Sequence, residues 1–190
     1  MAVAQAGSGA MTKRETSLAG VFVLEPRVFG DARGFFLESY NQRTMAELGI
    51  HERFVQDNHS FSAGNVLRGL HYQIPHPQGK LIRAVVGQIL DVAVDLRKNS
   101  ATFGKWDAVV LSGDNKHSLW IPPGLAHGFR VISDSAHLLY KTTDFYYPEL
   151  ERTIVWNDPD LKIDWQLKGD PLISAKDQRG IRFREAEKFN

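Results

Sequence analysis

The sequence of 190 residues predicts a single all-β domain, either a sandwich or a barrel. From residue 54 onward, short runs of branched and aromatic residues recur about every 10 residues, with Gly, Pro and Asn between them. Between positions 91 and 96, Val or Leu at even positions alternates with Asp or Ala at odd positions, which is the period of a half-buried strand. Hydrophobic residues make up 43% of the chain, as in ordinary globular proteins, and a chain of this length can bury a core that needs no metal or disulfide.

The elements are predicted in order along the chain. Residues 1–16 are small and polar with no hydrophobic period, and we interpret them as a flexible tail or a cloning remnant that precedes one domain at 17–190. A helix is predicted at 41–48, where Asn41 is the N-cap and Gly49 ends the helix. Strands are predicted at 81–86, 89–96, 106–111, 117–121, 128–132 and 137–142. After Trp156 we expect loops that end in a short amphipathic helix near 181–188.

Charge and cysteine content exclude several classes of protein. Lys and Arg together number 23 and Asp and Glu 22, so the chain lacks the positive field of nucleic-acid binders. The absence of cysteine excludes disulfides, thiolate zinc sites and cysteine nucleophiles. No apolar run reaches the roughly 18 residues that span a bilayer, and the N-terminus has no secretory signal. We therefore expect a cytoplasmic protein with neither a nucleic acid nor a membrane as partner.

Cationic and proton-transferring residues stand inside or beside the predicted strands. They are Arg68, His71, Lys80, Arg83, His127 and Tyr140. In the run VLRGLHYQ, a bulge at Gly69 would bring Arg68 and His71 to one cavity, because a bulge shifts the alternation of side chains by one residue. Each of these residues alone is more typical of a structural role. Together, on adjacent strands of a small barrel, they predict a cavity for a substrate that carries phosphate or pyrophosphate.

A metal centre is the alternative use of the histidines. The segment PPGLAH resembles the second motif of the cupin superfamily, in which that His often binds a metal. The first motif requires His-x-His, whereas the chain has His71, Tyr72 and Gln73 at this place. His59 or His117 would have to supply a missing ligand, and a catalytic metal normally has three protein ligands. We therefore expect no catalytic metal.

Seven blocks, in order, carry a family resemblance. They are DARGFFLESY, FVQDNHSFS, NVLRGLHYQ, QGKLIRAVVGQILDVAVDLR, SLWIPPGLAHGF, LLYKTTDFYYPELERTIVWNDP and LISAKDQRG. The chain from 18 to 180 thereby resembles the dTDP-4-dehydrorhamnose 3,5-epimerases, metal-free enzymes of dTDP-rhamnose biosynthesis. The resemblance implies a cupin-type jelly-roll β-sandwich or barrel with short helices and loop extensions at both ends. It also implies an isomerase without a cofactor, a dTDP-sugar substrate and a homodimer with exchanged N-terminal strands.

The resemblance also implies roles for individual residues. His71 is the general base, Tyr140 is the general acid, and Asp177 is the acidic partner that orients His71. Lys80 lies beside the carbonyl oxygen of the substrate. The positions that match contacts to the nucleotide, pyrophosphate or sugar are Arg33, Glu38, Gln56, Asn58, Arg68, His127, Glu151 and Lys176.

The chemistry of these residue types suits epimerisation beside a ketone. A base removes the α-proton, a Lys ammonium stabilises the enolate, and an acid returns a proton to the opposite face. Because both His71 and Tyr140 are present, we favour epimerisation at carbons 3 and 5 of dTDP-4-dehydro-6-deoxy-D-glucose. The alternatives are a single-centre epimerase or a 3,4-ketoisomerase of a dTDP-keto sugar, a non-catalytic cupin that binds a sugar nucleotide, and a metal-dependent cupin oxygenase.

Overall fold

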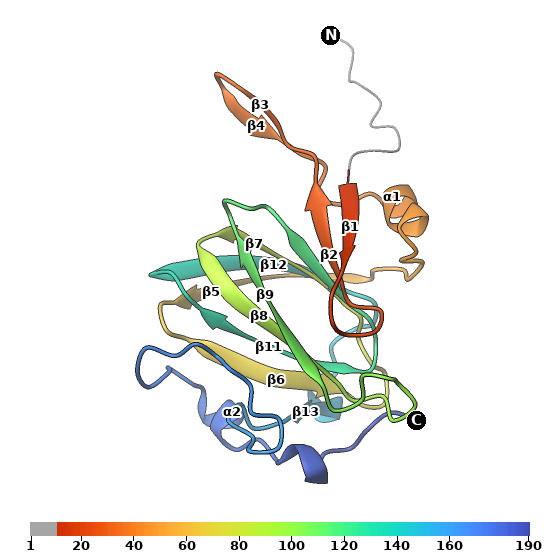
Figure 1. The fold of residues 1–190 in the computed structure, drawn as a ribbon, viewed down its shortest axis with the longest axis vertical. Helices are drawn as coiled ribbons and strands as arrows, with labels where there is room; N and C mark the ends of the chain where they lie inside the picture. The colour runs from red at the N-terminus through yellow and green to blue at the C-terminus, as the bar shows by residue number, and fades with distance from the viewer. Residues whose placement is uncertain (1–10) are drawn as a thin grey trace.

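Two antiparallel sheets face each other in the computed structural model, which describes residues 11–190 (Figure 1). The six-stranded sheet has the order β1 (Met11–Glu15), β2 (Phe22–Pro26), β10 (Ser118–Ile121), β7 (Lys80–Val86), β12 (Ser135–Thr142) and β5 (Gln56–Ala63). The five-stranded sheet has the order β13 (Glu151–Thr153), β6 (Leu67–Gln73), β11 (Leu125–Val131), β8 (Gln88–Asp95) and β9 (Trp106–Ser112). The predicted all-β fold is confirmed, and of the two predicted architectures the chain adopts the sandwich.

Apolar side chains form three layers. Between the sheets, side chains such as Ile82 and Leu138 pack against Ile89 and Phe129 of the opposite sheet. The outer face of the five-stranded sheet is covered by the C-terminal segment after β13 (Figure 1). One end of the outer face of the six-stranded sheet is covered by α1 (Gln42–Glu47) and its flanking loops. The outer face near β5 and β12 has no such cover from the described residues.

The remaining elements are short. A hairpin of β3 (Phe29–Asp31) and β4 (Gly34–Phe36) projects away from both sheets (Figure 1). The chain also contains α2 (Ala175–Gln178) and two 3₁₀ turns, Pro148–Leu150 and Phe183–Glu185. Among residues 11–190, no helix has the length and apolar character needed to cross a membrane.

The predicted elements between 41 and 142 are confirmed. The helix has Asn41 as its N-cap, whose side chain accepts a hydrogen bond from the Arg43 backbone, and Leu48 as its C-cap. Each of the six predicted strands is present, with ends that differ by at most three residues. The strand at 88–95 is buried on both faces and not on one, because the C-terminal segment covers the face that carries Val92 and Val94. Its Asp and Ala positions therefore face the interior between the sheets.

Two predictions at the chain ends are wrong. Residues 11–15 of the predicted tail form β1, an edge strand in which only Met11 is buried, so its sequence shows no apolar alternation. The remaining part of that tail, 1–10, lies outside the described residues. No α-helix forms at 181–188, where Ile181 pairs with Ile154 and Phe189 pairs with Arg97. These pairings hold the segment extended and leave a single 3₁₀ turn between them.

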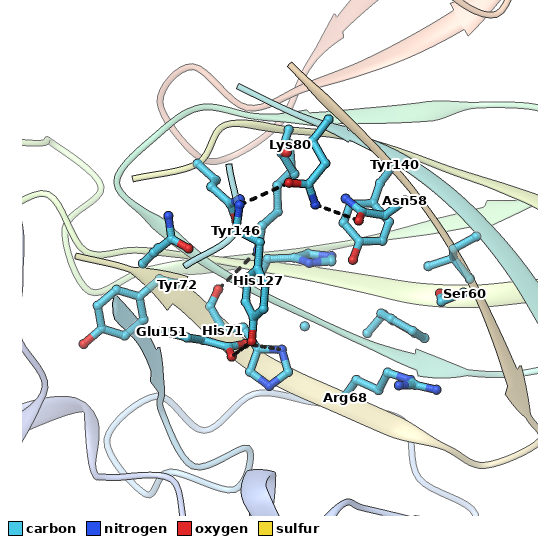
Figure 2. Close-up of a pocket in the computed structure, with 17 residues that line it drawn as sticks. Asn58, Ser60, Arg68, His71, Tyr72, Lys80, His127, Tyr140, Tyr146 and Glu151 are labelled. Atoms are coloured by element: carbon cyan, nitrogen blue, oxygen red, sulfur yellow. Dashed lines mark hydrogen bonds and ion pairs between the residues drawn. The ribbon is translucent and has the colours of Figure 1, made fainter. Parts of the chain in front are cut away.

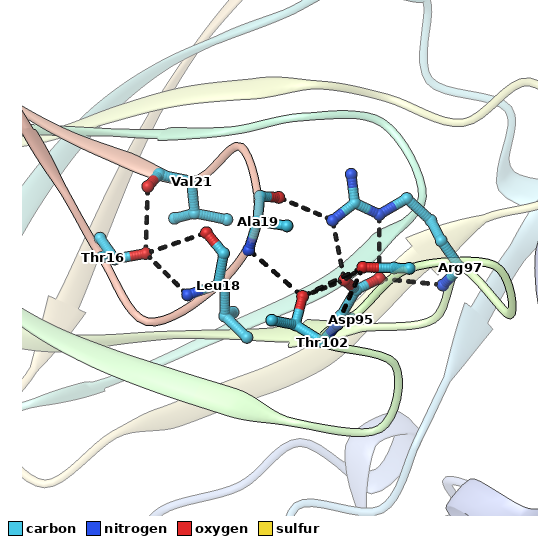
Figure 3. Close-up of polar contacts among 8 residues, drawn as sticks. Thr16, Leu18, Ala19, Val21, Asp95, Arg97 and Thr102 are labelled. Atoms are coloured by element: carbon cyan, nitrogen blue, oxygen red, sulfur yellow. Dashed lines mark hydrogen bonds and ion pairs between the residues drawn. The ribbon is translucent and has the colours of Figure 1, made fainter.

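A buried carboxylate joins the start of the domain to the β8–β9 connection (Figure 3). Asp95 is fully buried and accepts hydrogen bonds from the Arg97 backbone and guanidinium and from the hydroxyls of Ser100 and Thr102. Arg97 in turn donates to the Ala19 carbonyl at 2.7 Å, and the Ala19 N–H donates to Thr102 at 3.2 Å. Burial raises the pKa of Asp95, but these hydrogen bonds outweigh it and lower the pKa to about 2.

We expect Asp95→Asn to lower the free energy of unfolding by about 2–4 kcal/mol at pH 7, because it removes the charged partner of Arg97. A carboxylate whose pKa falls from 3.8 to about 2 on folding stabilises the protein fully above its unfolded-state pKa. The stability difference between the two proteins should therefore shrink as the pH falls from about 4 toward 2. Urea unfolding at several pH values measures it. A difference that does not change with pH would contradict this assignment.

Candidate active site

A cavity of about 380 Å³ opens between the two sheets (Figure 2). Its walls come from β5, β7 and β12 of one sheet, from β6, β11 and β13 of the other, and from the loop after β12. Eight of the predicted site residues line it: Gln56, Asn58, Arg68, His71, Lys80, His127, Tyr140 and Glu151. The predicted convergence of the cationic residues on one cavity therefore holds for Arg68, His71, Lys80 and His127.

An irregular register at Gly69 brings Arg68 and His71 to the same cavity. On β11 and β6, His127 pairs with His71 and Phe129 pairs with Arg68, so three steps on β6 oppose two on β11. Gly69 has a φ of +116°, and a Cβ atom there would lie 2.5 Å from the Cα of Gly128. Only glycine fits such a position, which explains the residue type and confirms the predicted bulge.

His71 is held by a buried carboxylate. Its Nε2 lies 2.6 Å from Oδ1 of Asp177, which is 2% exposed, and Oδ2 of Asp177 accepts from the Gly69 N–H at 3.2 Å. Burial raises the pKa of Asp177, but the hydrogen bonds from His71, Gly69 and Ser174 outweigh it and hold the pKa below its usual range. An ionised Asp177 requires the hydrogen on Nε2, which leaves the lone pair of the neutral ring on Nδ1.

Glu151 connects the cavity to the C-terminal segment. Its carboxylate accepts from the Lys176 ammonium and, at 2.7 Å, from the Tyr146 hydroxyl, and it lies 4.0 Å from His71 Nδ1. Burial raises the pKa of Glu151, but Lys176, Tyr146 and His71 outweigh it and lower the pKa. Glu149, the nearby acid, lies on an exposed 3₁₀ turn. Lys176 reaches the site through Glu151.

Lys80 and Tyr140 enter the cavity from the six-stranded sheet, opposite His71 (Figure 2). Burial lowers the pKa of Lys80 to about 8, although Glu151 and Asp91 act in the opposite direction. Burial also raises the pKa of Tyr140, and the charge of nearby Arg68 opposes that shift. At neutral pH, Lys80 therefore carries a charge and Tyr140 carries its proton.

Asp91 and Tyr146 were missed from the sequence. Asp91 is fully buried on β8, and its Oδ1 lies 2.9 Å from Nε2 of His127, while its Oδ2 has no hydrogen-bond partner among the described residues. Burial lowers the pKa of His127, against the attraction of Asp91. The sequence signal for Asp91 was its position inside an apolar strand. The alternation of that strand predicted that Asp91 faces solvent. Tyr146 had no signal, because it lies in a loop beside two other aromatic residues.

Some predicted residues do not lie in this cavity. Arg33 lies between β3 and β4, bonded to Asp31, and Glu38 accepts hydrogen bonds from two residues near the start of α1. Arg83 does not line the cavity, because strand alternation turns it to the face opposite Lys80. His59 is likewise on the outward face of β5, and His117 does not line the cavity either. Among residues 11–190, no group of three or more His or acidic residues is arranged to hold a metal ion.

The fold and the site define a cupin-type β-sandwich whose cavity holds a carboxylate-bound histidine opposite a tyrosine and a lysine. Residues 15–185 match the sequence profile of the dTDP-4-dehydrorhamnose 3,5-epimerases. The chain belongs to this family of isomerases.

Individual relatives cover almost the whole chain. The dTDP-4-dehydrorhamnose 3,5-epimerase of Pseudomonas aeruginosa is 58% identical over 180 residues, which cover 94% of this chain and 99% of that protein. That of Shigella flexneri is 54% identical over 177 residues, covering 92% and 97%. A crystal structure of the dTDP-6-deoxy-D-glucose-3,5-epimerase of Legionella pneumophila, in complex with dTDP-4-keto-L-rhamnose, matches with a TM-score of 0.91 at 47% identity. That match covers 93% of this chain and 95% of the other. The predicted family and cupin-type fold are confirmed.

Proposed function

We propose that this chain converts dTDP-4-dehydro-6-deoxy-D-glucose to dTDP-4-dehydro-L-rhamnose by inverting carbons 3 and 5. The observation that carries the proposal is His71 on one sheet, held by Asp177 of α2, facing Tyr140 and Lys80 on the other sheet across a cavity. The cytoplasmic location expected from the composition stays a prediction.

His71 acts as the base. Its Nδ1 lone pair takes the α-proton from carbon 3 or carbon 5, and Asp177 stabilises the imidazolium that results. The electron pair of the broken C–H bond moves into the ring and places negative charge on the carbonyl oxygen. Lys80 stabilises that enolate, because its ammonium lies in a buried setting where charge interactions are strong.

Tyr140 acts as the acid. It gives its proton to the carbon from the opposite face, so the configuration inverts and the ketone reforms. The phenolate then recovers a proton from solvent, and His71 releases the one it took. Each inversion is therefore balanced without an electron acceptor or donor, and it uses no cofactor.

The dTDP portion binds beside this centre. Arg68 and Lys176 supply cationic charge for the pyrophosphate, and Gln56, Asn58, His127 and Glu151 supply hydrogen-bonding groups. Arg33 and Glu38 complete the cavity of a second copy, in a homodimer that exchanges N-terminal strands. The projecting hairpin supports this arrangement, since Phe29, Phe35 and Phe36 are 48%, 60% and 69% exposed on it. Aromatic surface of this kind is typical of an interface.

The test is proton NMR of dTDP-4-dehydro-6-deoxy-D-glucose in deuterated water with the purified protein. We expect exchange of the protons at carbons 3 and 5, and formation of dTDP-rhamnose when an NADPH-dependent reductase is added. Exchange at one carbon alone would show a single-centre epimerase. If no proton exchanges while the nucleotide sugar remains bound, the chain is a binding protein and not an epimerase.

The pKa of Lys80 predicts the alkaline limb of the pH profile. Since the charged form stabilises the enolate, kcat/KM should fall as the pH rises through about 8. Tyr140 does not produce this limb, because its pKa is raised by burial. Lys80→Met should reduce kcat/KM by about 10²–10³-fold and remove the limb from the residual activity. If the residual activity keeps a limb near pH 8, another group is responsible.

A further inference from the structure

The loop at 143–147, which follows β12, brings Tyr146 to the active-site cavity (Figure 2). Within the described chain this loop belongs to no helix or strand, so its place depends on bonds to neighbouring elements. The Tyr146 N–H donates to Oε1 of Gln56 at 3.1 Å. The residues on either side of Tyr146 are both bonded to one side chain, that of Gln73 at the end of β6.

The side-chain amide of Gln73 is used within the protein. Its Nε2 donates to the Phe145 carbonyl at 3.1 Å and to the His76 carbonyl at 2.8 Å, and its Oε1 accepts from the Tyr147 N–H at 2.9 Å. Gln73 is 3% exposed. Although it lines the cavity, both of its amide hydrogens are engaged, so it has no donor left for a substrate. Any effect of Gln73 on the substrate must therefore act through the loop.

We propose that Gln73 is a positioning residue, which holds the 143–147 loop so that Tyr146 and Glu151 form one wall of the substrate cavity before the substrate binds. The inference rests on the proposed function, since it assigns this wall to the dTDP-sugar. The Tyr146 hydroxyl donates to Oε2 of Glu151 at 2.7 Å, and Glu151 is the register partner of Gln73 on β13. Gln73 is therefore connected to both ends of that hydrogen bond, to Glu151 through the strand ladder and to Tyr146 through the loop.

The residues assigned to proton transfer do not depend on this loop. His71 is held by Asp177. Tyr140 and Lys80 lie on β12 and β7, which are paired in the six-stranded sheet. Loss of the Gln73 hydrogen bonds should lower the fraction of molecules whose loop is in place, and the apparent affinity falls by that fraction. Because the bound state still has its loop in place, KM should rise while kcat changes little.

The experiment is Gln73→Met in the full chain, which nearly keeps the length of the side chain and removes its three hydrogen bonds. We expect the Kd for dTDP, measured by calorimetry, and the KM for the dTDP-sugar to rise together by about 10-fold. The kcat should stay within about threefold of the unchanged chain. Hydrogen–deuterium exchange of the loop amides should be faster in the free variant and slow again when dTDP is bound. Gln73→Glu, which also lacks the donor for the two carbonyls, is the second variant if Gln73→Met does not fold.

Asp95→Asn is the matched control for a general loss of stability, because none of the hydrogen-bond partners of Asp95 lies in the loop or lines the cavity. It should keep the Kd and the loop exchange of the unchanged chain. Unchanged Kd and loop exchange in Gln73→Met would overturn the proposal, as would a fall in kcat at constant KM or an equal loss of affinity in Asp95→Asn. Binding of dTDP and loop exchange require no turnover, so they decide the role of Gln73 even if the unchanged chain binds dTDP and epimerises nothing.

Discussion

His71→Ala is expected to lower kcat/KM by about 10²–10⁴-fold, the usual contribution of a general base. The expectation follows from the geometry, because Nε2 of His71 is bonded to the buried carboxylate of Asp177 and Nδ1 is left to take the α-proton. Removal of the imidazole leaves Oδ1 of Asp177 without its hydrogen-bond donor and leaves no group in the place of His71 to take the α-proton. Deuterium exchange at carbons 3 and 5 should fall by the same factor as product formation.

The control for this variant is the affinity for dTDP. Calorimetry should give a Kd within about threefold of the unchanged chain, because the groups assigned to the nucleotide, such as Arg68 and Gln56, remain. His51→Ala, on the surface, should change neither value. If His71→Ala keeps rapid exchange at both carbons, another cavity group is the base, and His127 is then the next residue to replace.

The strands of this fold could be predicted because their signals are local. Alternation and turn residues set the strands between 80 and 142, and the Gly69 bulge followed from one glycine between Arg68 and His71. The burial of β8 on both faces could not be predicted, since the cover comes from a segment that lies far along the chain. That cover explains why Asp91 was misjudged as a solvent-facing residue of a half-buried strand.

The site residues also divide into those that local sequence signals predict and those that they do not. Residues of neighbouring strands, such as His71 and His127, converge because the β6–β11 ladder pairs them directly. Asp177 is 106 residues from His71 and lies on a helical turn of four residues. No periodicity predicts such a contact, and it was expected only from the family resemblance. His59 shows that a candidate residue beside a site residue can still face away from the site. It follows the cavity residue Asn58 on β5, and strand alternation turns it to the opposite face of the sheet.

Tyr140→Phe is expected to separate proton removal from inversion. His71 still removes the α-proton, and its imidazolium exchanges that proton with solvent and returns it to the same face. Deuterium should therefore enter carbons 3 and 5 with retained configuration, while formation of the inverted product falls by about 10²–10⁴-fold. The phenyl ring fills the same space between Asn58 and Ile82, so the cavity should keep its shape.

The discriminating comparison is Tyr146→Phe, since Tyr146 also lines the cavity, whereas the hydroxyl of the third lining tyrosine, Tyr72, donates to the Glu187 carbonyl. The Tyr146 hydroxyl already donates to Glu151 at 2.7 Å, and that hydrogen bond raises the pKa of Tyr146 to about 12. It is therefore a poorer proton donor to the substrate than Tyr140, and its loss should slow inversion less. Proton NMR in deuterated water gives exchange and configuration in one measurement for both variants. If Tyr146→Phe stops inversion while Tyr140→Phe does not, the acid is Tyr146, and the hydrogen bond to Glu151 must break during each turnover.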